Sequence, residues 1–219
     1  PVGAVVPSVN PNILLYTTRV PLGVVGLITP WNFPLAIPVW KMAPALVYGN
    51  TIILKPASTA PHIGALIARM WEAVDLPKGV FNFVTGSGGA AGNEIATNPM
   101  VNAISFTGSA KVGHGIAVGA ASRNIRFQLE MGGKNPVIVL PDADLEQAAE
   151  ITVSGAMKYS GQKCTATSRA IVVGGVIEEF TTLVVDKVKK LKIGPGSDPA
   201  SVIVPVIDEP ARENIVAAV

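Results

Sequence analysis

Cys164 is the only cysteine in the chain and its strongest candidate nucleophile, at the end of the segment Gly161-Gln162-Lys163-Cys164. A thiol is the best nucleophile among uncharged side chains, but an unperturbed thiol, with a pKa of about 8.5, is only a few per cent ionised at neutral pH. A neighbouring group must therefore accept the proton or stabilise the anion. A lone cysteine is often only a small buried hydrophobic residue, so the assignment depends on the rest of the sequence.

Two other polar residues stand out. Glu130 ends a predicted strand just before Gly132 and Gly133, and Asn32 lies in the turn-rich segment PWNFP at residues 30–34. Competing patterns are missing, since the chain has no G-x-S-x-G elbow and no G-x-x-x-x-G-K-[ST] loop, and its S-x-x-K match lacks the companion motifs. With one cysteine and two histidines far apart in sequence, no metal-ligand spacing exists, and we expect no metal.

Two segments could bind an anion such as a phosphate group. Residues 86–91 (GSGGAA) satisfy the dinucleotide pattern G-x-G-x-x-G/A after a strand, but the acidic residue expected about twenty positions later is missing. An ordinary glycine-rich turn explains this segment equally well. Thr107-Gly108-Ser109 opens a predicted helix and can offer a hydroxyl, backbone N–H groups and the positive end of the helix dipole, although simple helix capping is the alternative.

The composition describes a soluble protein. Of the 219 residues 49% are hydrophobic, and the net charge of +2 gives no reason to expect nucleic acid as a partner. Residues 20–40 are long enough to span a bilayer, but four prolines would break the helix, so we expect no membrane segment. Without a signal peptide and with one cysteine, the chain is expected in the cytoplasm. Its apolar start and abrupt end suggest part of a longer protein or of an assembly.

Predicted strands and helices alternate through the first part of the chain. The strands are expected at 22–28, 51–55, 80–84, 102–106 and 125–130, and the helices at 38–48, 61–74, 90–97 and 109–121. This alternation predicts an α/β fold with a parallel sheet covered on both faces. Ligands bind beyond the carboxyl ends of such strands, which places these segments along one rim: 30–32, 55–56, 86–92, 107–109 and 130–133.

The pattern restarts after Gly133, and a hinge is expected at Gly132 and Gly133. Beyond the hinge, strands are predicted at 137–140 and 170–173, helices at 145–159 and 177–191, and the Cys164 loop between them. Ahead of the first sheet, residues 4–19 combine β-branched residues with a Pro- and Asn-rich turn, which predicts a two-stranded arm.

Five motifs stand together in an order that resembles the aldehyde dehydrogenase superfamily. They are PWNFP at 30–34, KP at 55–56, FTGS at 106–109, LEMGGK at 129–134 and GQKC at 161–164. The resemblance covers essentially the whole chain. It implies an oligomerisation arm at 1–20, a Rossmann-like dinucleotide-binding domain at 21–131 and the first part of an α/β catalytic domain at 132–219. Residues 129–136 and 161–169 are most similar to the 2,5-dioxopentanoate (alpha-ketoglutarate semialdehyde) dehydrogenases.

The resemblance also implies a reaction, the oxidation of an aldehyde, with 2,5-dioxopentanoate as a candidate, to a carboxylic acid with NADP or NAD. Cys164 attacks the aldehyde, the Asn32 amide and the Cys164 N–H form the oxyanion hole, and Glu130 activates the water that hydrolyses the thioester. Lys41 resembles a lysine that helps relay protons, although a surface lysine is the alternative. A homo-oligomer, dimer or tetramer, is implied for the complete protein.

The implied coenzyme residues are Thr29, Trp31, Lys55, Ser58, Gly88, Gly92, Thr107, Gly108, Ser109, Met131 and Gly132. One of them departs from the pattern of NAD-preferring members, which often carry glutamate where this chain has Ser58. Without that carboxylate, Ser58 and Lys55 could bind a 2'-phosphate, so we expect NADP to be used at least as well as NAD.

Two alternatives stay open. Relatives that transfer the acyl group to coenzyme A generally lack the glutamate at position 130, which counts against that reaction. The chain also lacks the later glutamate motif that holds the nicotinamide ribose in the family. The second alternative is therefore a non-catalytic fragment that only binds or assembles, and we expect little or no dehydrogenase activity from the 219-residue chain alone.

Overall fold

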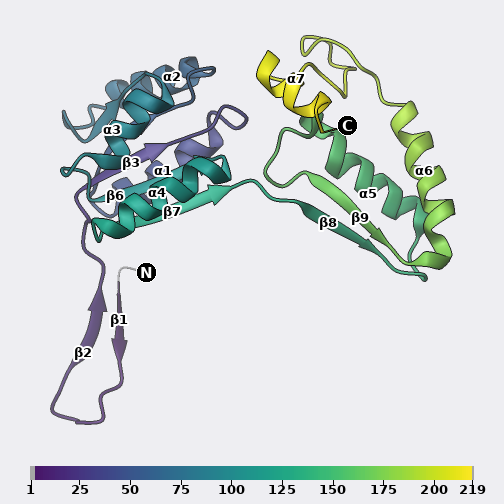
Figure 1. The fold of residues 1–219 in the computed structure, drawn as a ribbon. Coiled ribbons are helices and arrows are strands. Elements are labelled where there is room, and N and C mark those ends of the chain that lie inside the picture. Colours follow the sequence, from purple (N-terminus) through teal and green to yellow (C-terminus); the bar gives the residue numbers. More distant parts are fainter. Residues whose placement is uncertain (1–2, 219) are drawn as a thin grey trace. The chain divides into compact units, whose positions relative to one another are not determined.

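The computed structural model describes residues 3–218, which form two compact units, one up to Met131 and one from Gly132 onward (Figure 1). Residues 1, 2 and 219, which the predicted arm and the predicted catalytic part include, lie outside the described residues. Within residues 3–218, no helix has the length and the apolar character needed to cross a membrane.

The first unit begins with an antiparallel hairpin of β1 (Gly3–Val6) and β2 (Leu15–Thr18). The connection turns at Asn10, whose carbonyl accepts from the Ile13 N–H at 3.0 Å and whose side chain accepts from the Asn12 N–H at 3.0 Å. Both strands are exposed along their whole length. The predicted two-stranded arm is therefore present as a hairpin whose side chains are not buried.

A parallel sheet of five strands forms the centre of the first unit, in the order β5-β4-β3-β6-β7. Its members are β3 (Val24–Ile28), β4 (Thr51–Lys55), β5 (Phe81–Phe83), β6 (Ala103–Gly108) and β7 (Arg126–Met131). This parallel sheet confirms the predicted Rossmann-like α/β fold. Strand β6 runs two residues further than predicted, because β7 pairs with it as far as Gly108 opposite Met131.

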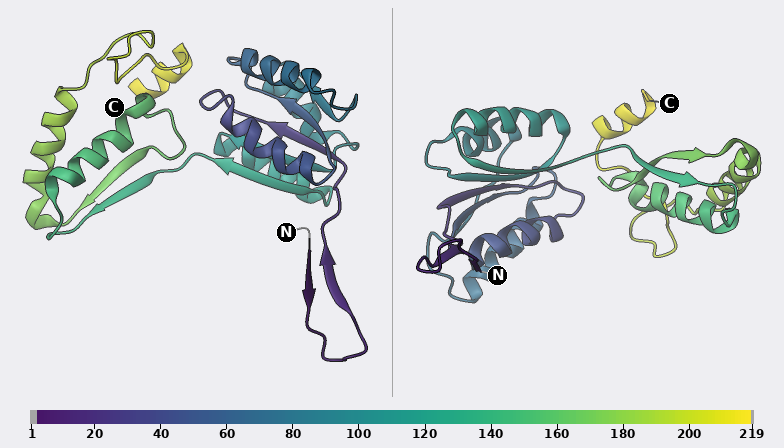
Figure 2. Two further views of the ribbon diagram at one scale, coloured as in Figure 1. Left: turned by 180° about the vertical axis from the view of Figure 1, so that it is seen from behind. Right: turned by 90° about the horizontal axis from the view of Figure 1, so that it is seen from below.

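Helices cover both faces of the sheet (Figures 1 and 2). One face packs against α1 (Ala36–Val47) and α2 (Pro61–Ala73) through a core that includes Leu27, Leu54 and Ile67. The other packs against α3 (Asn93–Thr97) and α4 (Ala110–Ser122) through a core that includes Ile104, Phe106 and Ile116. Alternate residues of each strand enter the two cores, as the twofold period of a strand requires.

Two helix starts differ from the prediction. Helix α1 begins at Ala36 rather than at Pro38, so that Pro38 lies in the first turn, where its missing N–H has no partner to lose. The predicted helix at 90–97 is a π-helical turn, η1 (Gly88–Gly92), which leads directly into α3.

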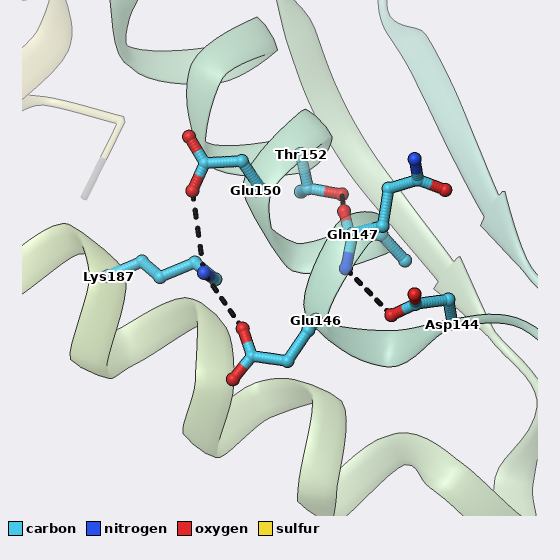
Figure 3. A network of polar contacts seen from close by, with 7 residues as sticks. Asp144, Glu146, Gln147, Glu150, Thr152 and Lys187 are labelled. Atoms are coloured by element: carbon cyan, nitrogen blue, oxygen red, sulfur yellow. Dashed lines mark hydrogen bonds and ion pairs between the residues drawn. The ribbon is translucent and has the colours of Figure 1, made fainter.

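The second unit has two parallel strands, β8 (Asn135–Val139) and β9 (Thr167–Val172), and two main helices, α5 (Leu145–Met157) and α6 (Ile177–Lys189). Val139, Ala149 and Phe180 form its core. At the surface, the Lys187 ammonium lies 2.9 Å from Glu146 and 3.4 Å from Glu150, and Asp144 caps α5 by accepting from the Gln147 N–H (Figure 3). The apolar core, rather than these exposed ion pairs, accounts for most of the packing of α6 against α5.

Three shorter helices complete the second unit: η2 (Lys158–Gly161), η3 (Gly174–Val176) and α7 (Glu209–Val216). Helix α7 was not predicted. Its start carries a recognisable signal, because Asp208 caps it by accepting from the Ala211 N–H at 2.9 Å and Pro210 lies in its first turn.

Candidate active site

A cavity lies beyond the carboxyl ends of β3 and β6, the point from which the strand order of the first sheet runs outward in both directions. The sheet continues from β3 through β4 and β5 on one side and from β6 to β7 on the other. Such a switch point is where parallel α/β sheets bind ligands. The cavity has a volume of about 730 Å³. Most of the predicted coenzyme residues line it, namely Thr29, Trp31, Gly88, Gly92, Thr107, Gly108 and Ser109.

Two threonines give this cavity unused hydrogen-bonding capacity. The residues Thr29 and Thr107 are only 3% and 8% exposed, and neither hydroxyl oxygen has a partner among the described residues. Leaving a buried hydroxyl unpaired costs about 1–3 kcal/mol. The cavity therefore suits a polar ligand that can pair with these groups, as a dinucleotide can.

The N-terminus of α4 forms one wall of the cavity. Ser109 caps this helix by accepting from the Val112 N–H at 3.4 Å, and the first turn has no acidic residue to neutralise the helix dipole. Glycine at position 108 lets the backbone lie close to the Phe106 ring, since a Cβ there would lie 2.4 Å from that ring. The segment Thr107–Ser109 thus has a geometry that suits a phosphate group.

Lys55 and Ser58, two other predicted coenzyme residues of the first unit, do not line the cavity. Lys55 is 3% exposed, its ammonium donates to the Pro56 carbonyl at 2.9 Å, and burial lowers its pKa. A Cβ on Gly92 would lie 3.8 Å from the Lys55 side chain, so this lysine runs beside the lining. Ser58 donates to the Gly86 carbonyl at 3.0 Å and lines a separate hollow of about 430 Å³.

Met131 and Gly132 are not among the residues that line the cavity. Met131 packs against α4, where a Cβ on Gly113 would meet its sulfur at 2.5 Å. Gly132 is the first residue of the second unit. Neither residue has a side-chain nitrogen or oxygen that could bind a coenzyme.

Three of the predicted catalytic residues belong to the first unit. Asn32 is half-buried in the turn after β3 and follows Trp31 of the cavity lining. Glu130 is exposed near the end of β7, and Lys41 is buried on α1. The Lys41 ammonium donates to the Ser105 hydroxyl at 2.9 Å, to the Gln128 side-chain oxygen at 3.1 Å and to the Phe106 carbonyl at 3.3 Å. Lys41 is therefore not the surface lysine that the sequence left open.

The buried ammonium of Lys41 should make the stability of this unit depend on pH. Burial lowers the Lys41 pKa from 10.5 to about 8, an effect that the charge of Glu130 partly opposes. Between those values the unfolded chain holds a proton that the folded chain lacks, so the free energy of unfolding rises as the pH rises. The rise is on the order of 3 kcal/mol.

Urea denaturation from about pH 7 to about pH 11 measures this contribution. We expect this pH-dependent contribution to be lost in Lys41→Met, because methionine has an apolar side chain of similar length. The same pH dependence in wild type and Lys41→Met would contradict the assignment.

Cys164 belongs to the second unit, where its side chain is exposed in the loop between η2 and β9. Asn135, at the start of β8, holds this loop by donating to the carbonyl of Cys164 at 2.7 Å and to that of Ala166 at 3.1 Å. No local sequence pattern points to Asn135, because its contact with Cys164 spans 29 residues.

The chain before Cys164 has an unusual backbone. Tyr159, Ser160 and Gly161 have φ angles of 59°, 55° and 71°, a conformation that costs of order 1 kcal/mol or more for each residue other than glycine. The Ser160 hydroxyl donates to the Val204 carbonyl at 2.6 Å and accepts from the Val204 N–H at 3.0 Å. These bonds hold the turn, and they give Ser160 a structural role instead of a catalytic one.

Known proteins resemble this chain over most of its length. The protein-family model described as "Aldehyde dehydrogenase family" matches residues 2–219. The alpha-ketoglutaric semialdehyde dehydrogenase of Bacillus subtilis is 54% identical over 88% of this chain and 39% of its own length. The 2,5-dioxopentanoate dehydrogenase of Saccharolobus solfataricus is 46% identical over 94% of this chain and 44% of its own length. The chain thus spans about two fifths of these curated relatives.

Solved structures agree with the sequence relatives. A betaine aldehyde dehydrogenase from Staphylococcus aureus, in complex with NAD+, superposes with a TM-score of 0.94 at 35% identity, covering 100% of this chain and 43% of that one. A 3,6-anhydro-L-galactose dehydrogenase in complex with NADP superposes with a TM-score of 0.90 at 41% identity, covering 98% and 46%.

Proposed function

Since this chain belongs to the aldehyde dehydrogenase family, we propose that it carries the nucleophile, the general base and the coenzyme groove of an enzyme that oxidises an aldehyde to a carboxylic acid. The observation that supports this most directly is the cavity beyond β3 and β6. There the hydroxyls of Thr29 and Thr107 lack protein partners among the described residues, and α4 presents its N-terminus. Such a groove suits the ribose and phosphate groups of NAD or NADP.

In the first half of the reaction, Cys164 reacts as the thiolate: its sulfur forms a bond to the aldehyde carbon, and the carbonyl electron pair moves onto oxygen. The Asn32 amide and the Cys164 N–H donate to that oxygen, and each such donor contributes roughly 3 kcal/mol to transition-state stabilisation. A nicotinamide coenzyme held in the cavity beyond β3 and β6 would supply the acceptor for the hydride that leaves the same carbon, and the acyl group then remains on Cys164 as a thioester. A reducing compartment such as the cytoplasm suits an exposed thiol with this role.

In the second half, Glu130 accepts a proton from water while the water oxygen bonds to the thioester carbon. The carbon–sulfur bond then breaks, Cys164 leaves as thiolate and the carboxylic acid is released. General-base assistance of this kind is worth about 10²- to 10⁴-fold in rate.

The substrate that we propose is 2,5-dioxopentanoate. Curated relatives that are 46–54% identical to this chain carry that name or its synonym alpha-ketoglutarate semialdehyde. The test is to mix the complete gene product carrying this chain with 2,5-dioxopentanoate and either coenzyme, and to follow the absorbance of the reduced nicotinamide. Succinate semialdehyde and betaine aldehyde serve as comparison substrates. A higher kcat/KM for either comparison substrate would overturn the substrate assignment, and no activity with any aldehyde would overturn the function.

Acyl transfer to coenzyme A is the alternative fate of the thioester. The presence of Glu130 favours hydrolysis, because a thiol acceptor does not need a base that activates water. Repeating the assay with coenzyme A distinguishes the two reactions. We expect the free acid as product in both cases, and an acyl-coenzyme A product would show that hydrolysis is the wrong assignment.

We also propose that NADP is used at least as well as NAD, because Ser58 adds no carboxylate that would repel a 2'-phosphate, and the Lys55 ammonium keeps two N–H donors besides its bond to the Pro56 carbonyl. Ser58→Glu should lower kcat/KM for NADP by about 10- to 100-fold through charge repulsion and leave that for NAD within about threefold. Ser197→Glu, which adds the same charge at an exposed position of the second unit, is the matched control. A wild-type enzyme with a strong preference for NAD would contradict this proposal.

The β1–β2 hairpin is the proposed subunit contact. Val5, Leu14 and Tyr16 of this hairpin are 74%, 73% and 66% exposed, and exposed strand edges readily pair with another chain. Deleting residues 3–18 from the complete gene product should reduce its molar mass in light scattering. An unchanged molar mass would exclude the hairpin as a subunit contact.

A further inference from the structure

Four polar side chains of the first unit meet on the face of the sheet that α1 covers. Ser105 of β6 lies opposite Gln128 of β7 in the strand register. Gln128 and Glu130 are two residues apart in one strand, so their side chains point to the same face. Lys41 reaches this face from α1 and is buried there.

Gln128 connects the ammonium of Lys41 to the carboxylate of Glu130. Its side-chain oxygen accepts from Lys41 at 3.1 Å and from the Ser105 hydroxyl at 2.5 Å. Its side-chain nitrogen donates to a Glu130 carboxylate oxygen at 2.6 Å. Hydrogen bonds to charged groups are the strong ones among polar contacts.

The two charges permit only one orientation of the Gln128 amide. With the amide reversed, its NH₂ group would face an ammonium that cannot accept a hydrogen bond, and its oxygen would face a carboxylate that cannot donate one. The Lys41 and Ser105 donors therefore point the Gln128 N–H toward Glu130. Because Glu130 is exposed, this bond selects one position for a carboxylate that would otherwise rotate freely.

We infer that Gln128 is a positioning residue, whose amide is fixed by Lys41 and Ser105 and holds the Glu130 carboxylate in the orientation that activates water. The inference rests on the proposed function of Glu130. An amide does not exchange its protons readily enough to relay them during catalysis, so Gln128 orients the base and Lys41 orients Gln128. Loss of this bond should slow hydrolysis of the thioester and leave the earlier steps unaffected.

Two substitutions separate this role from simple support of Lys41. Gln128→Met removes both polar atoms at nearly constant size, whereas Gln128→Glu keeps an acceptor for Lys41 and Ser105 but cannot donate to Glu130. In the complete gene product, both variants should lower kcat by about 10- to 100-fold and leave kcat/KM for the aldehyde unchanged, because kcat/KM reports only the steps up to the thioester. Gln147→Met, at an exposed position of α5, is the matched control and should behave as wild type.

The deacylation step is measured directly by rapid quenching of a single turnover and intact mass of the acylated protein. We expect the acylated form to persist about 10- to 100-fold longer in both Gln128 variants. The inference would be overturned if the acylated form had the wild-type lifetime in both variants. It would also be overturned if only Gln128→Met lost activity, or if kcat and kcat/KM fell equally. A wild-type enzyme that reduces neither coenzyme would instead overturn the proposed function itself, and with it this role.

Discussion

Replacing Cys164 by alanine is expected to reduce aldehyde oxidation by the complete gene product by at least about 10⁴-fold. The change removes the sulfur that we propose as the nucleophile, and the chain has no second cysteine to replace it. Because the side chain is exposed and the loop is held through the Cys164 carbonyl by Asn135, the fold should be unaffected. The measurement is the rate of reduced-nicotinamide formation.

Two controls accompany the Cys164 variant. Its thermal unfolding midpoint and its affinity for the coenzyme should equal those of wild type, since the cavity beyond β3 and β6 belongs to the first unit. Residual activity above about one per cent would mean that the thiol is not the essential nucleophile.

Glu130→Gln has the second largest expected effect, a fall in kcat of about 10²- to 10³-fold. The amide cannot accept a proton from water, so the thioester forms but is not hydrolysed. A burst of one reduced nicotinamide per active site should therefore precede a slow steady rate, as expected when a later step becomes limiting. Stopped-flow absorbance measures both phases.

The matched control for this variant is Glu72→Gln, at an exposed position of α2, which should keep the wild-type rate. Loss of the burst in Glu130→Gln would place Glu130 in an earlier step, such as deprotonation of the thiol. Since Gln128 only orients the carboxylate, the loss in Gln128→Met should be smaller than the loss in Glu130→Gln.

The sequence by itself determined most of the order of strands and helices along the chain, and it supplied the candidate catalytic residues. These features are local: apolar period, β-branched runs and glycine or proline at the ends mark each element, and motifs such as LEMGGK are contiguous. The strand at 51–55 was predicted at its observed limits because strong turn signals bound it. Helix α7 carried a capping signal that was overlooked.

The tertiary structure alone decided which elements are neighbours. Strand pairing joins β3 to β6 across more than seventy residues, and only this pairing creates the cavity where the hydroxyls of Thr29 and Thr107 lie buried. Only the tertiary structure places Ser105 opposite Gln128, and only it brings the Asn135 amide to the Cys164 carbonyl. A local pattern determines which face of a strand is apolar. It does not determine which strand lies alongside, because that choice depends on how the whole chain buries its apolar surface.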